Sequence, residues 1–397
     1  MPQTIPFPHR VDIFRHLVRA DKATIGETPL VITVRRTTLL EDGFRQLSKI
    51  TPAQLKQTVK VRFVSALGVP EAGIDQHGLF KEFLEDISKR AFASDFGLFR
   101  TTDDGNVVPS VGSGVHENHL ELLEFVGRMF SKALYEGIVI DVPFAPFVYA
   151  KMVGRINYLE DLPSLDAQLY KNLCFLKHYE GDVEDLGLSF TIDEDLFGHV
   201  RTKEIKPGGA AIAVTNENKY EYIHIMSDYR LNQECKAQFK ALVGGFRAIM
   251  PEKFIRFFAP RELQVLMSGE NVDFDISDLR RHTKYEGGYF DGHNTIRSFW
   301  QVVEEMAPKE KSMFLKFCTS CSNPPVGGFR HLEPPFTIRF VAAISSDDVE
   351  LIGKDATRLP TASTCFNVLK LPAYQKKSSL KQKLMYAVNS GAGFELS

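Results

Sequence analysis

Residues 358–372, RLPTASTCFNVLKLP, contain the cysteine from which the interpretation of this chain starts. Pro360 and the small polar residues after it argue against a helix. The apolar pattern of NVLKL at 367–371 is typical of a strand, and Pro372 ends it. We therefore expect Cys365 where an irregular loop meets a strand. Loops that rigid elements hold in place often carry chemistry.

The rest of the last hundred residues alternates between strand and helix patterns. TIRFVAAI at 337–344 is a predicted strand, and residues 378–388 have the apolar spacing of a helix that Gly391 ends. The helix side chains expected to face inward are Leu380, Leu384, Met385 and Val388. This part of the chain is predicted to be a compact α/β unit.

Most of the chain before this unit is predicted to be helical. Apolar spacing indicates helices at 11–19, 79–90 and 119–135. The side chains of the third helix expected to face inward are Leu120, Leu123, Phe130 and Leu134. Strand patterns occur at 30–36, at 188–192 and at 211–215, where the last two are predicted to pair. The whole chain is therefore predicted to have an α+β fold.

A glycine-rich segment, KYEGGYFDG at 284–292, lies between two helical patterns. Gly287 and Gly288 are compatible with a hinge, because glycine tolerates backbone changes that other residues resist. A simple turn explains the same residues equally well.

Composition limits the possible classes of function. A chain of 397 residues, 44% of them hydrophobic, is long enough for two or three domains. A formal net charge of -2 gives no reason to expect nucleic acid or an anionic membrane as a partner. No segment has the length of a transmembrane helix, and residues 1–8 do not resemble a signal peptide. We therefore expect a cytoplasmic or nuclear location.

Five scattered cysteines fit reduced thiols better than a disulfide framework. Cys318 and Cys321 have the spacing of half a zinc site, but no second pair accompanies them. We expect core or turn cysteines there, and no metal site.

Three roles for Cys365 are compatible with the residues alone. A buried packing cysteine is the commonest role of a free thiol, and it is favoured in the absence of other information. A cysteine hydrolase needs a base and an oxyanion hole, but no histidine follows Cys365, and His331 is the nearest one before it. Thioester exchange needs less, because a thiol with a pKa of about 8.5 is already a few per cent thiolate at neutral pH.

The run LPTASTCFN at 359–367 resembles the active-site signature of HECT-type ubiquitin ligases. The likeness extends from Val31 to the C-terminus. The ASTC motif at 362–365 and the terminal GFELS are most similar to the proteasome-associated subgroup of the family. Eight further segments resemble the pattern of this family in order: 73–83, 125–154, 161–173, 179–190, 214–223, 266–279, 285–300 and 314–329.

The resemblance implies a bilobal fold. Residues 1–30 would be a helical extension, and residues 31–281 an N-lobe that docks a ubiquitin-conjugating enzyme through about 160–230. A flexible hinge at 282–288, with Gly287 and Gly288, would lead to a C-lobe at 289–397 that carries the nucleophile. The chain would be the catalytic fragment of a longer protein whose N-terminal region binds substrates.

The resemblance also implies the chemistry. Cys365 would accept ubiquitin from the thioester of the conjugating enzyme and pass it to a lysine amine, with Thr364 and Phe394 in supporting roles. Polyubiquitin chains and the proteasome as a partner are expected. No metal or organic cofactor is expected, because the thioester already stores the activation energy. The implied docking residues are Leu169, Asn172, Leu173, Phe175, Leu176, Leu188, Tyr222 and Met226.

Two residues depart from the family pattern. Phe175 stands where relatives can carry a polar residue, which puts the choice of conjugating enzyme in doubt. Ser363 stands where most relatives have a histidine, so that histidine cannot be the general base here. An attacking lysine with a pKa of about 10.4 must still lose a proton, and a carboxylate is the expected acceptor. The candidates are Asp347, Asp348, Asp355 and Glu395.

Two alternatives to a ligase remain open on the sequence. One is a cysteine hydrolase acting on ubiquitin, which would place a histidine beside Cys365. The other is a non-catalytic ubiquitin-binding module with an inert cysteine, whose thiol would react slowly with iodoacetamide.

Overall fold

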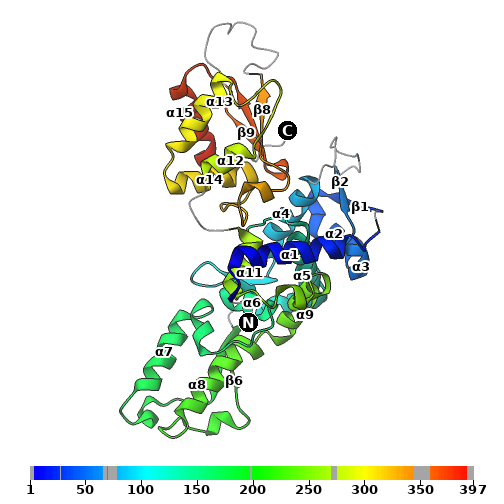
Figure 1. The fold of residues 1–397 in the computed structure, drawn as a ribbon. Helices are drawn as coiled ribbons and strands as arrows, with labels where there is room; N and C mark the ends of the chain where they lie inside the picture. The colour runs from blue at the N-terminus through cyan, green and yellow to red at the C-terminus, as the bar shows by residue number, and fades with distance from the viewer. Residues whose placement is uncertain are drawn as a thin grey trace.

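The computed structural model of the chain contains two separate hydrophobic cores. The first consists of residues between Val11 and Met267 together with Val326, and the second of residues between Leu279 and Val388; Figure 1 shows the two bodies that they form. We call the two bodies the first and the second lobe. Both contain helices and strands, as the predicted α+β fold requires. The structure describes residues 4–26, 28–65, 69, 78–196, 199–269, 275–342 and 358–390.

The first lobe is mainly helical. Its α-helices are α1 (Phe7–Lys22), α2 (Leu39–Leu47), α3 (Pro52–Leu55), α4 (Gly78–Phe92), α5 (His119–Glu136), α6 (Pro146–Met152), α7 (Ala167–His178), α8 (Lys219–Asp228), α9 (Lys236–Ile249), α10 (Glu252–Ile255) and α11 (Pro260–Ser268). Short 3-10 helices are η2 (Arg36–Thr38), η3 (Val111–Val115), η4 (Leu159–Ser164), η5 (Val183–Leu186) and η6 (Gly209–Ala211), and η7 (Tyr229–Gln233) is a π-helix.

The strands of the first lobe form three two-stranded sheets. Their bounds are β1 (Leu30–Arg35), β2 (Val59–Val64), β3 (Phe99–Thr101), β4 (Val107–Pro109), β5 (Thr191–Leu196) and β6 (His199–Glu204). β1 and β2 are parallel, and the other two pairs are antiparallel. The pairing predicted between 188–192 and 211–215 is reduced to one bridge, between Ser189 and Ala213. β5 pairs instead with β6, a strand that the sequence did not indicate.

The packing of α5 against α9 forms the centre of the first lobe. Leu123, Phe130 and Leu134 of α5 are buried as predicted, whereas Leu120 is 37% exposed because it lies at the outer start of the helix. Gly127 of α5 and Gly245 of α9 allow the close approach of the helices. A Cβ atom on Gly245 would lie 2.0 Å from the carbonyl oxygen of Glu124, so no side chain fits there.

The second lobe packs helices against a four-stranded sheet with the order β7-β8-β10-β9. β10 pairs with β8 in parallel and with β9 in antiparallel orientation. Leu380, Leu384 and Val388 of the last helix are buried, as predicted, and Met385 is partly buried. The element bounds are α12 (Ile276–Arg281), β7 (Lys284–Glu286), α13 (Asn294–Glu304), α14 (Pro308–Thr319), η8 (Phe329–His331), β8 (Thr337–Val341), β9 (Thr361–Ser363), η9 (Thr364–Phe366), β10 (Val368–Pro372) and α15 (Lys377–Ser390).

The junction between the lobes lies upstream of the predicted hinge at 282–288. Leu279 of α12 already belongs to the second core, and β7 is an edge strand of the second sheet, paired with β8. The predicted hinge segment is therefore hydrogen-bonded into the second lobe. Gly287 and Gly288, with φ of 70° and 97°, form the turn after β7. The chain passes between the cores between Met267 and Leu279.

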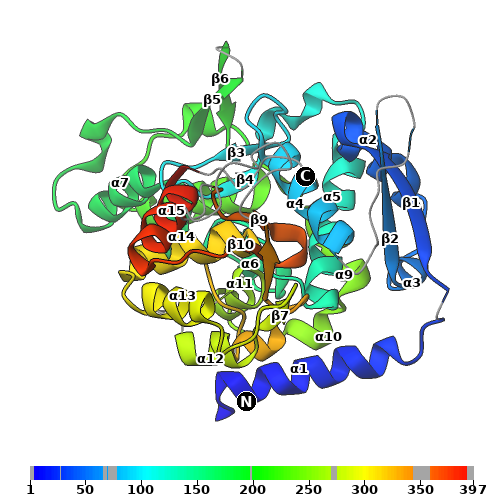
Figure 2. The same ribbon diagram turned by 90° about the horizontal axis from the view of Figure 1, so that it is seen from above.

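The lobes touch along the loop that follows α14. Val326 belongs to the first core, although it lies in the sequence of the second lobe. The Sγ of Cys321 donates to the carbonyl oxygen of Ser268 (3.3 Å), and Arg15 of α1 donates to the carbonyl oxygen of Val326 (2.6 Å). Figure 2 shows α1 running beneath both α12 and α10. Within the described ranges, no helix is both long and apolar enough to span a membrane.

Candidate functional site

Cys365 lies in a tight turn at the end of the second sheet. The turn is η9, which connects β9 to β10, and Ser363 pairs with Val368 across it. The predicted junction of loop and strand is thus a hairpin, whose first strand, β9, is only three residues long. Thr364 begins η9 and is half-buried. The backbone of Cys365 is therefore held at a sharp connection between two paired strands.

Asn367 closes this turn in the left-handed region, with φ of 53°. Its side chain is completely buried. Its backbone N–H donates to the carbonyl oxygen of Thr364 (3.1 Å), and its own carbonyl oxygen accepts from the N–H of Thr337 on β8 (2.9 Å). Its Nδ2 donates to the carbonyl oxygen of Pro334 (2.5 Å). These bonds fix the turn to the neighbouring strand and to the loop before it.

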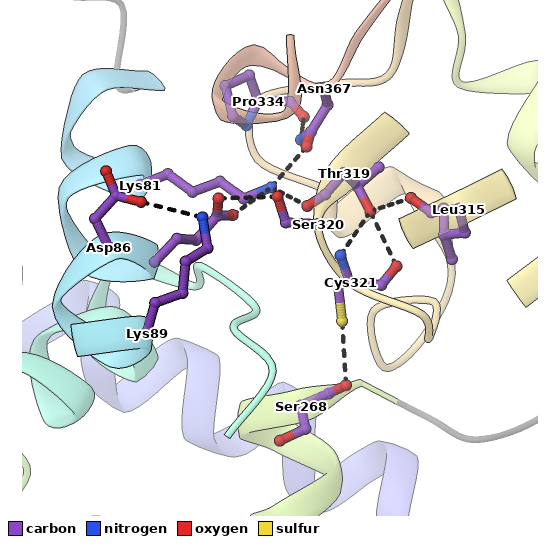
Figure 3. Close-up of polar contacts among 11 residues, drawn as sticks. Lys81, Asp86, Lys89, Ser268, Leu315, Thr319, Ser320, Cys321, Pro334 and Asn367 are labelled. Atoms are coloured by element: carbon purple, nitrogen blue, oxygen red, sulfur yellow. Dashed lines mark hydrogen bonds and ion pairs between the residues drawn. The ribbon is translucent and has the colours of Figure 1, made fainter. Parts of the chain in front are cut away.

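The buried Lys81 of α4 contacts the same turn from the first lobe (Figure 3). Its Nζ donates to Oδ1 of Asn367 (2.7 Å) and to the carbonyl oxygen of Thr319 at the end of α14 (2.8 Å). Only 2% of the Lys81 surface is exposed. An ammonium group is expensive to bury without partners, so these two acceptors make its position possible.

Glu85, one helical turn after Lys81, is also buried at this contact. Its Oε1 lies 3.9 Å from Nζ of Lys81, and its Oε2 accepts from the hydroxyl of Ser320 (2.8 Å). Burial raises the pKa of the Glu85 carboxyl, and the charge of Lys81 opposes this shift. Two segments of the second lobe, at Thr319–Ser320 and at Asn367, thus meet one charged pair on α4.

Three other thiols are buried and poorly ionised. Burial raises the pKa of Cys235 to about 12 and that of Cys321 to about 11, and it raises the pKa of Cys318 well above the usual value. Cys174 is half-buried on α7. The described part of the chain contains no group of three or more His, Cys, Asp or Glu side chains arranged to hold a metal ion. Cys318 and Cys321 occupy a core position and a turn position.

Residues 85–397 match the family model described as HECT-domain (ubiquitin-transferase). The match covers most of the chain and includes both the turn with Cys365 and the sheet that holds it. The chain belongs to the HECT family. The likeness inferred from LPTASTCFN and the segments before it is thereby confirmed.

Several curated proteins are similar to this HECT chain over its whole length. It is 46% identical to "Ubiquitin-protein ligase E3B" of Homo sapiens and 43% identical to "E3 ubiquitin-protein ligase UPL6" of Arabidopsis thaliana. It is 37% identical to "E3 ubiquitin-protein ligase HUL5" of Saccharomyces cerevisiae. Each alignment includes 100% of this chain but only 40%, 38% and 44% of the respective relative. The chain thus spans less than half the length of these relatives.

The predicted docking residues lie in the first lobe, on α7, on α8 and just before β5, and α7 and α8 are in contact. Four of them contribute to the first core, namely Leu173, Leu176, Tyr222 and Met226. Leu169 and Leu188 are half-buried, and Asn172 is exposed. Phe175 is 60% exposed, and its ring lies 5.4 Å from that of Tyr179. The exposed part of this surface is therefore centred on Phe175.

Several predicted site residues fall outside the described residues. Phe394 is one, and the candidate general bases are the others: Asp347, Asp348, Asp355 and Glu395. Ser363 lies in β9, two residues before Cys365.

Sequence reasoning missed Lys81, Glu85 and Asn367. A signal for the first two was present, because Lys81 and Glu85 lie four residues apart beside Phe80 and Leu84 on a helix with an apolar face. Charged residues at such positions indicate a buried polar contact. The partner of that contact could not be found, because it lies 286 residues further along the chain.

Proposed function

We propose that this HECT domain accepts ubiquitin on Cys365 as a thioester and transfers it to a lysine amine. The observation that carries the proposal is the position of Cys365 in a tight turn within the part of the chain that matches the HECT domain, while Cys235, Cys318 and Cys321 are buried with raised pKa values. The names of the relatives, which are ubiquitin-protein ligases, support it.

The chemistry has two steps. In the first, the thiolate of Cys365 attacks the thioester carbonyl of a charged conjugating enzyme, a new C–S bond forms, and the thiolate of the enzyme leaves. In the second, the amine of the acceptor lysine attacks the new thioester, a C–N bond forms, and Cys365 leaves as a thiolate. The proton of the acceptor ammonium passes to a base or to water. Neither step needs a redox partner, because no atom changes its oxidation state.

The turn positions the backbone of Cys365, and its residues 363–367 include no histidine or carboxylate that could act as an acid or base. The bonds around Asn367 hold the backbone next to Cys365, and holding two reactants in place lowers the entropy cost of their encounter. A serine such as Ser363 cannot take the place of a histidine as general base, so the predicted carboxylates are the candidate side chains for accepting the proton. Thr364 and Phe394 keep their predicted supporting roles.

We further propose that the conjugating enzyme docks beside Phe175, on the surface formed by α7 and α8. An exposed aromatic side chain above half-buried leucines is a typical anchor of an interface. The two lobes would then change their relative position to bring Cys365 to the docked conjugating enzyme. Acceptor lysines of substrates or of ubiquitin, the proteasome as a further partner, and a cytoplasmic or nuclear location belong to the same proposal.

A charging experiment tests the proposal. The domain is mixed with ubiquitin, its activating enzyme and a conjugating enzyme, and the products are separated without reductant. We expect an adduct that reductant cleaves, no adduct with Cys365→Ala, and a reductant-resistant ester with Cys365→Ser. Cys235→Ala, which removes a buried thiol, serves as the control and should charge normally. An adduct on Cys365→Ala would refute the proposal, and cleavage of a ubiquitin C-terminal ester would favour the hydrolase.

A further inference from the structure

The contact of Lys81 with Asn367 joins the two lobes at the turn that carries Cys365 (Figure 3). Three features set it apart from an ordinary surface contact. Both side chains are buried, the donor carries a charge, and the acceptor is two residues from the cysteine. Hydrogen bonds to a charged group are stronger than those between neutral groups, and a buried site increases the difference.

The amide of Asn367 has one possible orientation in this site. The ammonium of Lys81 can only donate and therefore requires the carbonyl oxygen Oδ1. The carbonyl of Pro334 can only accept and therefore requires the amide nitrogen Nδ2. Lys81 and Pro334 thus hold the amide from opposite sides. Because Asn367 is in the left-handed region, where asparagine is tolerated but most residues are strained, its position determines how the turn closes.

Lys81 also bonds to a second part of the C-lobe, the end of α14. Its Nζ donates to the carbonyl oxygen of Thr319, while Glu85 accepts from Ser320, the next residue. Lys81 and Glu85 of α4 therefore form hydrogen bonds with two separate segments of the second lobe. These bonds exist only while the second lobe lies against α4, so they stabilise one arrangement of the lobes.

That arrangement suits the second step of the reaction better than the first. Figure 1 shows α7 and α8 at the end of the molecule that lies away from the C-lobe. A conjugating enzyme docked on these helices would therefore be bound at the end of the molecule away from the second lobe, which carries Cys365. The turn lies against α4 instead, as the bond between Lys81 and Asn367 requires.

We propose that Lys81 is a positioning residue for the transfer of ubiquitin from Cys365 to the acceptor lysine. It holds Asn367, and through Asn367 the turn, in the arrangement in which the C-lobe rests on α4. The inference rests on the proposed function, since it assumes that Cys365 carries the thioester. Lys81 acts through Asn367 and the turn, so its effect should appear in discharge and not in charging.

Separate measurements of charging and discharge test this inference. The domain is charged in a single turnover, and the thioester is then chased with free lysine. We expect Lys81→Met to charge within about twofold of the parent and to discharge about tenfold more slowly, because one buried charge-assisted contact typically has an effect of that size. Lys81→Arg keeps a charged donor and should recover most of the discharge rate. Lys89→Met is the matched control, because Lys89 lies on the same helix but is exposed and pairs with Asp86.

Asn367→Gly provides an independent test. Glycine accepts the left-handed backbone, so this variant removes the side-chain contact without straining the turn. It should also slow discharge. In the double variant with Lys81→Met the two effects should be less than multiplicative, because both changes remove the Lys81–Asn367 contact, while each also removes one bond of its own, to Pro334 or to Thr319. Asn367→Gly decides the question if Lys81→Met does not fold.

Several results would overturn the inference. They are a parent-like discharge rate in Lys81→Met or in Asn367→Gly, effects that multiply in the double variant, and equal loss of charging and discharge together with a lower melting temperature. The last result would indicate a purely structural role. A parent domain that forms no thioester at all would instead refute the proposed function.

Discussion

Asp42, like Lys81, is an ionisable residue that is buried in the first lobe. Only 2% of its surface is exposed. Its Oδ2 accepts from the backbone N–H of Arg35 (3.1 Å) and from Nε of Arg35 (2.8 Å), and its Oδ1 accepts from Nη2 of Arg45 (2.6 Å). The guanidinium of Arg35 holds the pKa of the Asp42 carboxyl well below its usual range. One carboxylate therefore ties the end of β1 to the start of α2.

The low pKa of Asp42 has a consequence for stability. A carboxyl whose pKa is lowered by folding contributes stability above its unfolded pKa of about 4, and this contribution is lost as the pH falls towards the folded pKa. Asp42→Asn should reduce the free energy of unfolding by about 1–3 kcal/mol at pH 7, because the backbone N–H of Arg35 and the guanidinium groups of Arg35 and Arg45 lose a charged acceptor. Urea unfolding at pH 7 and at pH 3 should show the gap between parent and variant becoming smaller in acid. Glu41→Gln, an exposed change in the same turn, is the control, and a gap that stays constant or grows in acid would contradict the argument.

At the residue scale, the sequence predicted the turn around Cys365 but not what holds it. Proline, small polar residues and a following apolar run are local signals, and they place the cysteine at the start of a strand. The acceptors of Lys81 are not local, because Thr319 and Asn367 come from another lobe. No periodicity within α4 contains that information.

At the scale of elements, the contact between α5 and α9 depends on Gly245 but not on its neighbour Gly244. A Cβ atom on Gly245 would lie 2.0 Å from the carbonyl oxygen of Glu124, whereas one on Gly244 would meet nothing within 4 Å. Substitutions at these two adjacent positions of α9 therefore distinguish the effect of helix propensity from that of packing.

Alanine at these two positions should have opposite effects. Gly245→Ala should lower the free energy of unfolding by about 3 kcal/mol or more, because the helices must move apart to accept a methyl group. Gly244→Ala should be neutral or stabilise the protein by up to about 1 kcal/mol, because alanine favours a helix over glycine. Chemical unfolding of both variants measures the difference. Equal effects at both positions would show that the close approach of α5 and α9 does not limit stability.

The elements that the sequence predicted well are the long amphipathic ones, such as α1, α4, α5 and α15. Their inward faces repeat over several turns and are visible without a partner. Three-residue strands carry no such repeat, which explains why β7 and β9 were missed. The predicted hinge fell on β7 for the same reason, since a short edge strand followed by two glycines resembles a flexible segment.

At the scale of the whole molecule, the proposed docking surface and the turn with Cys365 lie apart. Figure 1 shows α7 and α8 at the end of the first lobe away from the second lobe, whereas the turn with Cys365 contacts α4 where the two lobes meet. Sequence likeness implied both sites, but it did not give the distance between them or the face on which the C-lobe rests. That relation depends on contacts such as Lys81–Asn367 and Cys321–Ser268, which join residues far apart in the chain.

This separation predicts that docking variants affect only the step that needs the conjugating enzyme. Phe175→Glu places a charge at the centre of the proposed docking surface, and it should slow charging of the domain by about tenfold or more, as expected for an anchor residue. The thioester that does form should discharge to lysine at the parent rate, because Phe175 is remote from the turn with Cys365. Val200→Glu is the matched control, since Val200 is 69% exposed on β6 and is not among the docking residues. Normal charging of Phe175→Glu, or an equal loss in Val200→Glu, would mean that the conjugating enzyme docks elsewhere.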